Sequence, residues 1–206
     1  MKLVVATRSR QKMREIRKIL AVVPGLEVLD LDEAGVAVDP AEEDLEPFDT
    51  FEENARSKAS WFHARSGLPT VADDSGIVVD ALDGAPGVRS KRFSPEEGLT
   101  GLDRDRANNA YLVERLADVP PEERTAHYVC VAVLVDGDAE PLVCRGEAAG
   151  LILDAPRGEN GFGYDPFFFD PDLGCTFAEI SRDEKNERSH RGRAFRALAA
   201  ALLKRR

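Results

Sequence analysis

Residues 70–82 read TVADDSGIVVDAL, with two adjacent carboxylates between apolar runs. We interpret the segment as one or two β-strands interrupted around Asp73–Gly76, with the carboxylates at a strand end. Neighbouring carboxylates repel each other unless water or a cation neutralises them, and ligands of α/β proteins bind at strand ends. The alternative is a solvated turn in which the Asp and Ser side chains bond to the backbone.

Working outward, apolar periodicity and turn residues predict helices around the first strands and paired strands in the middle of the chain. Strands are expected at 3–6, 27–31, 127–135 and 141–149, the last two forming a hairpin. Helices are expected with Ile16, Ile19, Leu20 and Val23 on one face, and at 51–64, 105–116 and 189–204. Segment 32–49 is predicted to be an exposed acidic loop and 94–105 a mobile one. This order of elements predicts an α/β protein with a mixed sheet in two lobes.

Composition narrows the classes of partner. The 206 residues carry a net charge of -10, which disfavours binding to a long polyanion but permits a small anionic substrate at a local cation cluster. Cys130, Cys144 and Cys175 show no paired spacing that would indicate zinc or a disulfide. Neither a signal-peptide pattern nor an apolar run of about 20 residues is present, so we expect a cytoplasmic protein.

Familiar catalytic motifs are missing from the sequence. It contains no GxxxxGK[ST] phosphate loop, no GxGxxG opening a helix and no GxSxG nucleophile motif. His63, His127 and His190 lack the spacing of metal ligands. The candidate chemistry therefore lies in acidic, basic and glycine-rich segments.

The first such segment joins the first strand to the first helix. It comprises Thr7, Arg8, Ser9, Arg10, Gln11 and Lys12. The N–H groups and positive dipole end of a helix N-terminus bind anions, and Lys12 adds a full charge, so the segment is a candidate phosphate site. A polar connecting loop without function is the alternative.

Glu53 admits two interpretations. Thr50 and Glu53 have the spacing of a capping box, which by itself explains the glutamate. The same helix places Asn54 and Lys58 four residues apart on one face, so Glu53, Asn54 and Lys58 could together meet a phosphate cluster. A solvated helix face is the alternative.

Two segments near the C-terminus suggest recognition of a base and a further anion. Residues 161–166 read GFGYDP, where aromatic rings can stack on a base and glycines let the backbone approach it. Lys185, His190 and Arg191 lie near the expected start of the last helix, with Ser189 as its N-cap. Cations there oppose the helix dipole unless an anion binds. Buried aromatics and a basic surface patch are the respective alternatives.

Taken in order, these segments closely resemble the inosine triphosphate pyrophosphatase (ITPase) family over essentially the whole chain. The matching motifs are Ala6-Thr7…Lys12…Glu15-Ile16, Thr50-Phe51…Glu53-Asn54-Ala55…Lys58-Ala59, Ala72-Asp73-Asp74-Ser75-Gly76, Gly84-Ala85-Pro86-Gly87, Gly161-Phe162-Gly163-Tyr164-Asp165-Pro166 and Glu184-Lys185…Ser189-His190-Arg191-Gly192. Ser9 stands where the family usually has asparagine, and Arg8 where it often has a small residue.

The resemblance implies one domain over residues 1–206 with the two-lobed Maf/ITPase type of α/β fold, in which helices flank a long mixed β-sheet and the lobes border a central cleft. It also implies a homodimer and Mg²⁺-dependent hydrolysis of the deaminated purine triphosphates ITP, dITP and XTP to the monophosphate and pyrophosphate. Asp74 would be the general base and a metal ligand, and Glu53 a second metal ligand.

The remaining site residues carried over from the family bind the nucleotide. The triphosphate would be held by Thr7, Arg8, Ser9, Arg10, Gln11, Lys12, Lys58 and Lys185, with Ser75 also touching the nucleotide. The base would be held by Phe162, Gly163, Tyr164, Asp165, His190 and Arg191. Backbone N–H groups near Gly163 and Tyr164, or the two cations, could donate to a 6-oxo group and reject the 6-amino group of ATP.

Two rival functions stay open from the sequence. A Maf-like pyrophosphatase acting on pyrimidine or modified nucleotides shares the architecture but lacks the His190-Arg191 motif. A nucleotide sensor without catalysis is the other rival. It is disfavoured because it would not need both Glu53 and Asp74.

Overall fold

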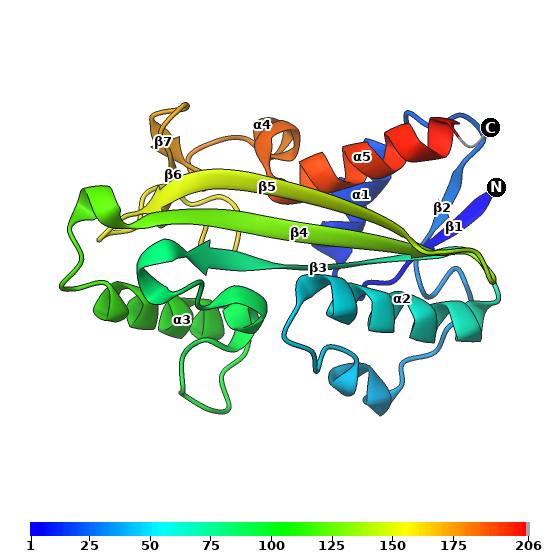
Figure 1. The fold of residues 1–206 in the computed structure, drawn as a ribbon, viewed down its shortest axis with the longest axis horizontal. Coiled ribbons are helices and arrows are strands. Elements are labelled where there is room, and N and C mark those ends of the chain that lie inside the picture. Colours follow the sequence, from blue (N-terminus) through cyan, green and yellow to red (C-terminus); the bar gives the residue numbers. More distant parts are fainter. Residues whose placement is uncertain (205–206) are drawn as a thin grey trace. The chain divides into compact units, whose positions relative to one another are not determined.

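The computed structural model describes residues 1–204 and shows an α/β protein with a seven-stranded sheet (Figure 1). The strand order is β2-β1-β3-β4-β5-β6-β7. The strands are β1 Lys2–Val5, β2 Glu27–Leu29, β3 Thr70–Val79, β4 Thr125–Val135, β5 Leu142–Ile152, β6 Phe168–Asp170 and β7 Cys175–Thr176. β1 pairs in parallel with β2 and β3, whereas β6 is antiparallel to β5 and β7, so the predicted mixed sheet is confirmed.

The helices connect these strands. They are α1 Arg10–Leu20, α2 Phe51–Ser66, α3 Gly101–Arg115, α4 Arg182–Arg188 and α5 His190–Lys204. Four 3₁₀ turns lie between them, at Pro40–Asp44, Asp80–Leu82, Gly87–Arg92 and Pro121–Glu123. None of the helices within residues 1–204 combines the length and apolar composition that crossing a lipid bilayer requires.

The chain divides into two compact units, and strands β3, β4 and β5 each contribute residues to both. Unit 1 contains Met1–Asp74, Cys130–Gly146 and the segment from His190 onward. Unit 2 contains Ser75–Val129 and Glu147–Ser189. Each unit has its own apolar core and its own part of the predicted site.

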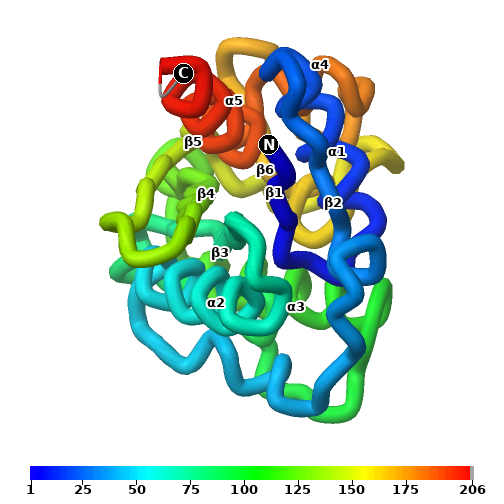
Figure 2. Tube along the Cα trace, turned by 90° about the vertical axis from the view of Figure 1, so that its right-hand side faces the viewer, coloured from blue at the N-terminus to red at the C-terminus, as the bar shows by residue number. Residues whose placement is uncertain are grey.

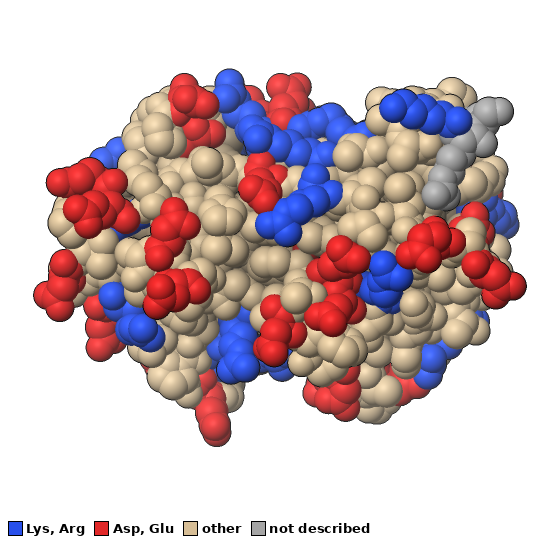
Figure 3. All heavy atoms as spheres, in the orientation of Figure 1, with Lys and Arg blue, Asp and Glu red and all other residues tan. Residues whose placement is uncertain are grey.

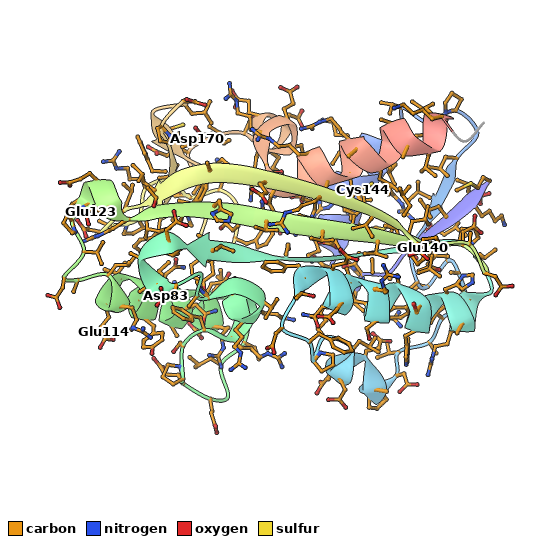
Figure 4. The ribbon with its side chains drawn as sticks, in the orientation of Figure 1. Asp83, Glu114, Glu123, Glu140, Cys144 and Asp170 are labelled. Atoms are coloured by element: carbon orange, nitrogen blue, oxygen red, sulfur yellow. The ribbon has the colours of Figure 1, made fainter. Side chains whose placement is uncertain are left out.

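In unit 1, α1 and α5 lie together on one face of the strands and α2 lies on the other (Figures 1 and 2). The α1 residues Met13, Ile16 and Leu20 recur at helical spacing, so one stripe of the helix is buried. They share a core with α5 and with Cys144 of β5, which Figure 4 labels. Cys130 belongs to the same core, and Cys130, Cys144 and Cys175 are all free thiols.

In unit 2, α3 packs on the opposite side of the strands from α4 (Figures 1 and 2). Its core is aromatic: the Tyr128 ring lies 4.6 Å from the Phe168 ring, centroid to centroid, and 6.0 Å from that of Phe177. Leu112 and Leu116, at the C-terminal end of α3, complete the core. The face shown in Figure 3 carries acidic and basic side chains interspersed, so it presents no continuous field of one sign.

Four expectations need correction. β3 is a single uninterrupted strand from Thr70 to Val79, so Asp73 and Asp74 lie within it and not at its end. Segment 32–49 is not simply an exposed loop, because it contains a capped 3₁₀ turn and two buried apolar side chains, Val36 and Leu45.

The other two corrections concern helix limits. α3 begins at Gly101, four residues earlier than expected. The sequence pattern placed its start too late because the first turn is polar and the buried face starts only at Ala107. Lys185 belongs to a separate short helix, α4, which precedes the last helix. A short helix with one buried residue gives no apolar periodicity for sequence analysis to detect.

Close packing between β5 and α5 depends on Gly146. A Cβ at this position would lie 2.2 Å from the His190 carbonyl oxygen and 2.4 Å from the Ala194 nitrogen, both backbone atoms that cannot rotate away. The absence of a side chain therefore lets the first turn of α5 approach the strand.

We expect Gly146→Ala to lower the free energy of unfolding by at least about 2 kcal/mol, the scale of overpacking against backbone. Gly137→Ala is the control, because Gly137 has a positive φ of 61° but open space around it. That control should cost only about 1 kcal/mol of backbone strain. Urea denaturation of both variants decides between collision and strain, and equal losses would contradict the packing role of Gly146.

Candidate active site

Asp73 and Asp74 are both buried in the middle of β3, with 1% and 8% of their surfaces exposed. The solvated-turn interpretation is therefore wrong. Because consecutive side chains of a strand point to opposite faces, the two carboxylates enter different environments. Asp73 meets groups from α1 and α5, whereas Asp74 meets α2.

Asp73 is an ionised counter-ion for two cations. Its Oδ2 accepts from Lys12 Nζ at 3.1 Å and from Arg191 Nε at 3.3 Å. Burial alone would raise the pKa of Asp73, but the charges of Lys12 and Arg191 outweigh burial and hold it well below its usual range. Arg191 also donates to Glu15 at 3.3 Å, so its guanidinium is shared between two carboxylates of unit 1.

Asp74 is poised for proton transfer. Its Oδ2 accepts a hydrogen bond of 3.0 Å from Asn54 Nδ2 on α2. Burial, reinforced by the negative charge of Glu46, raises the pKa of Asp74 to about 6. A carboxylate with a pKa near neutrality is ionised enough to accept a proton and basic enough to hold it.

Glu46 is a site residue that the sequence analysis missed. Its carboxylate is bonded to Lys58 Nζ, and the same ammonium donates to the Asp73 carbonyl oxygen at 2.6 Å. Burial opposes ionisation of Glu46, but the charge of Lys58 outweighs it and lowers the pKa of Glu46. The acidic segment 32–49 offered no local pattern to single out this glutamate, because its importance comes from contact with α2 and β3.

Glu46 and Asp74 form the carboxylate pair that suits a divalent cation. Their mutual repulsion is what a cation would relieve, and Mg²⁺ needs only one or two carboxylates when phosphate oxygens and water complete its shell. Within residues 1–204, no group of three or more His, Cys, Asp or Glu side chains could hold a metal. A cation here would therefore depend on the substrate for further ligands.

Glu53 lies elsewhere on α2. Its side chain is exposed, and its Oε2 accepts from the Thr50 hydroxyl at 2.6 Å while its N–H donates to the same hydroxyl. The N–H bond confirms Thr50 as the N-cap of α2, but the Glu53 carboxylate bonds the Thr50 hydroxyl and not its backbone N–H, so the predicted capping box is half formed. The metal-ligand role predicted for Glu53 gains no contact from this arrangement.

The segment predicted to bind phosphate opens α1. Ser9 is its N-cap and accepts from the Lys12 N–H at 3.3 Å, so serine can take the capping place at this position. Thr7 Oγ1 accepts from the Ser9 N–H at 3.2 Å. A cavity of about 500 Å³ borders the segment and is lined by Thr7, Ser9, Arg10 and Arg14 among others.

Arg8 is occupied by protein groups. Its guanidinium forms a bidentate pair with Glu42, with N–O distances of 3.1 and 2.7 Å, and bonds Asp32 at 3.2 Å. The carbonyl oxygens of Val36 and Ala37 accept from the same group at 3.1 and 3.0 Å. Of the five N–H donors of the guanidinium, only one hydrogen of Nη1 is left without an acceptor by these contacts.

In unit 2, the glycine-aromatic loop surrounds Asp165. The Asp165 carboxylate accepts from the Phe162 N–H at 2.8 Å and pairs with the buried ammonium of Lys185. Lys185 Nζ also lies 4.7 Å from the centre of the Phe162 ring. Gly161 is required here, because a Cβ would lie 2.1 Å from Asp165 Oδ2. The structure thus brings Lys185 to the loop residues Asp165 and Phe162.

Not every predicted donor is available to a ligand. The Gly163 N–H, expected to read a base, donates to Asp105 Oδ2 at 2.9 Å. The Tyr164 side chain is buried and its hydroxyl donates to the Ser90 carbonyl oxygen at 2.8 Å. The remaining predicted residues lie as follows: Arg10 is exposed, Gln11 and Ser75 are half-buried, and His190 is buried at the start of α5.

Comparison with known proteins identifies the family of the chain. The model of the Ham1 family matches residues 3–201. The chain belongs to the Ham1 family. A relative from Frankia alni named dITP/XTP pyrophosphatase is 48% identical over 202 residues, covering 98% of this chain and 97% of the relative. Another of that name from Geobacter sulfurreducens is 48% identical over 197 residues, 96% of this chain and 94% of the relative.

Solved structures of Ham1 proteins share the fold. The HAM1 protein from Coxiella burnetii superposes with a TM-score of 0.86 at 35% identity, covering 99% of each chain. A nucleoside-triphosphatase / dITP/XTP pyrophosphatase from Mycobacterium abscessus gives a TM-score of 0.74 at 40% identity, covering 98% of this chain and 99% of the other. The resemblance seen in the sequence motifs and the expected ITPase-like fold class are therefore confirmed.

The raised pKa of Asp74 predicts that the free energy of unfolding of this Ham1 protein depends on pH. Between about pH 4 and 6 the folded state binds more protons at Asp74 than the unfolded state does, so stability falls as pH rises through that window. Asp74→Asn should therefore stabilise the protein more at pH 7.5 than at pH 4.5, by roughly 2 kcal/mol. Denaturation in EDTA at both pH values measures this difference. Asp80→Asn, on an exposed residue, is the control, and a difference equal to that of the control would contradict the assignment.

The contacts of Arg8 predict that it acts inside the protein. Glu42→Gln and Arg8→Met should each lower the free energy of unfolding by about 1 kcal/mol, and their effects should not add, because both break one bidentate pair. A double-mutant cycle by urea denaturation measures the coupling. Additive losses, with Glu42→Gln leaving the KM for nucleotide unchanged while Arg8→Met raises it, would instead show that Arg8 binds phosphate.

Proposed function

We propose that this Ham1 protein hydrolyses deaminated purine nucleoside triphosphates, ITP, dITP and XTP, to the monophosphate and pyrophosphate. The observation that carries the proposal is the buried Asp74 carboxylate, which is held by Asn54, while the ammonium groups of Lys12 and Lys58 bind the neighbouring Asp73. A general base next to ammonium groups suits attack by water on a phosphate. The names of the Frankia and Geobacter relatives support the same substrate class.

In the proposed reaction, Asp74 takes a proton from a water molecule as its oxygen bonds to the α-phosphorus. The bond from the α-phosphorus to the bridging oxygen breaks, and pyrophosphate leaves with the electron pair. Lys12 and Lys58 stabilise the charge on the phosphate oxygens. Asn54 holds Asp74 in place through its 3.0 Å hydrogen bond.

Mg²⁺ is the proposed cofactor, held by Glu46 and Asp74 with oxygens of the triphosphate. It would neutralise phosphate charge and lower the pKa of water. Asp73 is less suited to hold it, because two cations, Lys12 and Arg191, share one oxygen of its carboxylate, whereas Glu46 pairs with Lys58 alone.

The Phe162–Asp165 loop is the proposed base-recognition element. Inosine and xanthosine carry a 6-oxo acceptor where adenosine carries a 6-amino donor, so a site of donors would leave buried groups unpaired with ATP. GTP shares the 6-oxo group and should be rejected less strongly. We further propose a cytoplasmic homodimer, which light scattering would test as twice the mass of one chain.

The proposed metal site at Glu46 and Asp74 predicts which glutamate sets the Mg²⁺ requirement. Glu46→Gln should raise the Mg²⁺ concentration for half-maximal activity at least about tenfold, because a charged ligand is lost. Glu53→Gln should leave it unchanged, since glutamine can still accept from Thr50. Activity titrated with Mg²⁺ compares the two variants directly, and the reverse order would return the metal site to Glu53.

The product pattern tests the function itself. Incubation with ITP should release pyrophosphate, so that phosphate appears only after an inorganic pyrophosphatase is added. kcat/KM for ITP should exceed that for ATP by roughly 10⁴-fold, the scale of hydrogen-bonded discrimination. Asp74→Asn should lower turnover at least about 10²-fold, as expected for loss of a general base.

Each rival function gives a different result. A sensor would bind ITP without releasing pyrophosphate, and a Maf-like enzyme would prefer pyrimidine or modified nucleotides. A kcat/KM for ATP within tenfold of that for ITP would refute the proposed base preference.

A further inference from the structure

Helix α3 holds the Gly163 backbone on both sides. The Gly163 N–H donates to Asp105 Oδ2 at 2.9 Å, and the Gly163 carbonyl oxygen accepts from Asn109 Nδ2 at 2.9 Å. Asp105 and Asn109 are four residues apart, so they lie on one face of α3. Two side chains of a rigid helix therefore occupy both polar groups of one loop residue.

Asn109 is itself fixed before it reaches the loop. Its Nδ2 also donates to the Asp105 carbonyl oxygen at 2.8 Å, and only 7% of its surface is exposed. A flipped amide would place its oxygen against two carbonyl oxygens, so the donor orientation is set. Its Oδ1 is buried and has no partner among the described residues, which makes Asn109 a poor choice for stability alone.

The neighbouring residue Asn108 supports Tyr164 of the loop through Ser90. Its Oδ1 accepts from the N–H groups of Phe93 and Ser94 at 3.1 and 2.9 Å, and its Nδ2 donates to the Ser90 carbonyl oxygen at 3.3 Å. That same Ser90 oxygen accepts from the Tyr164 hydroxyl. α3 thus fixes Gly163 directly and Tyr164 through Ser90.

The loop needs such support because its glycines give no conformational preference of their own. Gly161 and Gly163 both have positive φ, at 79° and 63°, a region that glycine enters freely but does not favour over others. Side-chain bonds must therefore select the one conformation that places Phe162 and Tyr164.

We propose that Asp105 and Asn109 are positioning residues that fix the Phe162–Tyr164 loop and thereby set base selection, which rests on the proposed function of this loop. Neither residue touches the nucleotide. The Asp105 carboxylate also occupies the Gly163 N–H, so this donor is not available to the base. Loss of the clamp affects binding of the base and leaves the chemistry at Asp74 in place.

The first test is hydrogen exchange, which needs no substrate. In Asp105→Ala and Asn109→Ala, amides in a peptide covering residues 158–166 should exchange at least about tenfold faster than in the wild type, because each variant loses a partly buried hydrogen bond to Gly163. Asp105→Asn keeps an acceptor for the Gly163 N–H and should restore slow exchange. Asp103→Ala is the matched control on the same helix, because Asp103 is exposed and pairs with Arg106.

The second test is a split between KM and kcat. For Asp105→Ala and Asn109→Ala, KM for ITP should rise and the ITP-to-ATP ratio of kcat/KM should fall by about tenfold, as for one lost hydrogen bond, with kcat within about threefold. Asp105→Asn and Asp103→Ala should behave as the wild type. If Asp105→Ala does not fold, Asn109→Ala and Asn109→Asp, which removes both amide donors, carry the test.

The outcomes separate the two proposals. Unchanged exchange in the alanine variants would show that α3 does not clamp the loop and would overturn the inference. Faster exchange with unchanged KM and base ratio would overturn the role in base selection. Failure of the wild type to release pyrophosphate from ITP would refute the proposed function, and the exchange measurement would still stand on its own.

Discussion

The buried carboxylate of Asp73 is the constraint on which unit 1 depends. An ionised group in the middle of a buried strand is tolerated only when cations neutralise it, and removing one partner of such a pair costs about 3–5 kcal/mol. Lys12 comes from α1 and Arg191 from α5. Both helices must therefore lie on the face of β3 to which Asp73 points. Gly146 makes the approach of α5 possible, so packing and charge impose the same arrangement.

Because consecutive side chains of a strand point to opposite faces, Asp74 has a different chemical environment from Asp73. Asp73 and Asp74 are adjacent in sequence, but they face opposite sides of β3 and have pKa values shifted in opposite directions. Asp73 stays ionised and organises cations. Asp74, on the side of α2, gains protons near neutrality because burial and Glu46 disfavour its charge. Separation of pKa values within a carboxylate pair is how one site obtains both a fixed charge and a base.

The sequence identifies reactive side chains more reliably than the contacts that surround them. Apolar periodicity and capping residues located α1 and α2, and the adjacent carboxylates Asp73 and Asp74 were identified as a site. It was placed at a strand end because its partners, 61 and 118 residues away, are not visible to local analysis. Glu46 was missed for a similar reason, and the metal role of Glu53 came from the family resemblance. The capping pattern of Glu53 is local, whereas Glu46 is defined by contact with Lys58 across the fold.

Residue type alone overestimates the number of groups that can bind a ligand, because some of their hydrogen-bond donors are already used inside the protein. Arg8 and the Gly163 N–H both suit an anion or an oxo group, yet carboxylates and carbonyl groups of the protein already occupy them. Lys12 differs, because an ammonium has three donors and one described bond, to Asp73, leaves two for a phosphate. The groups fit to meet a substrate are thus those that the fold holds in place without using up their donors. Only tertiary structure distinguishes them from groups that serve as internal supports.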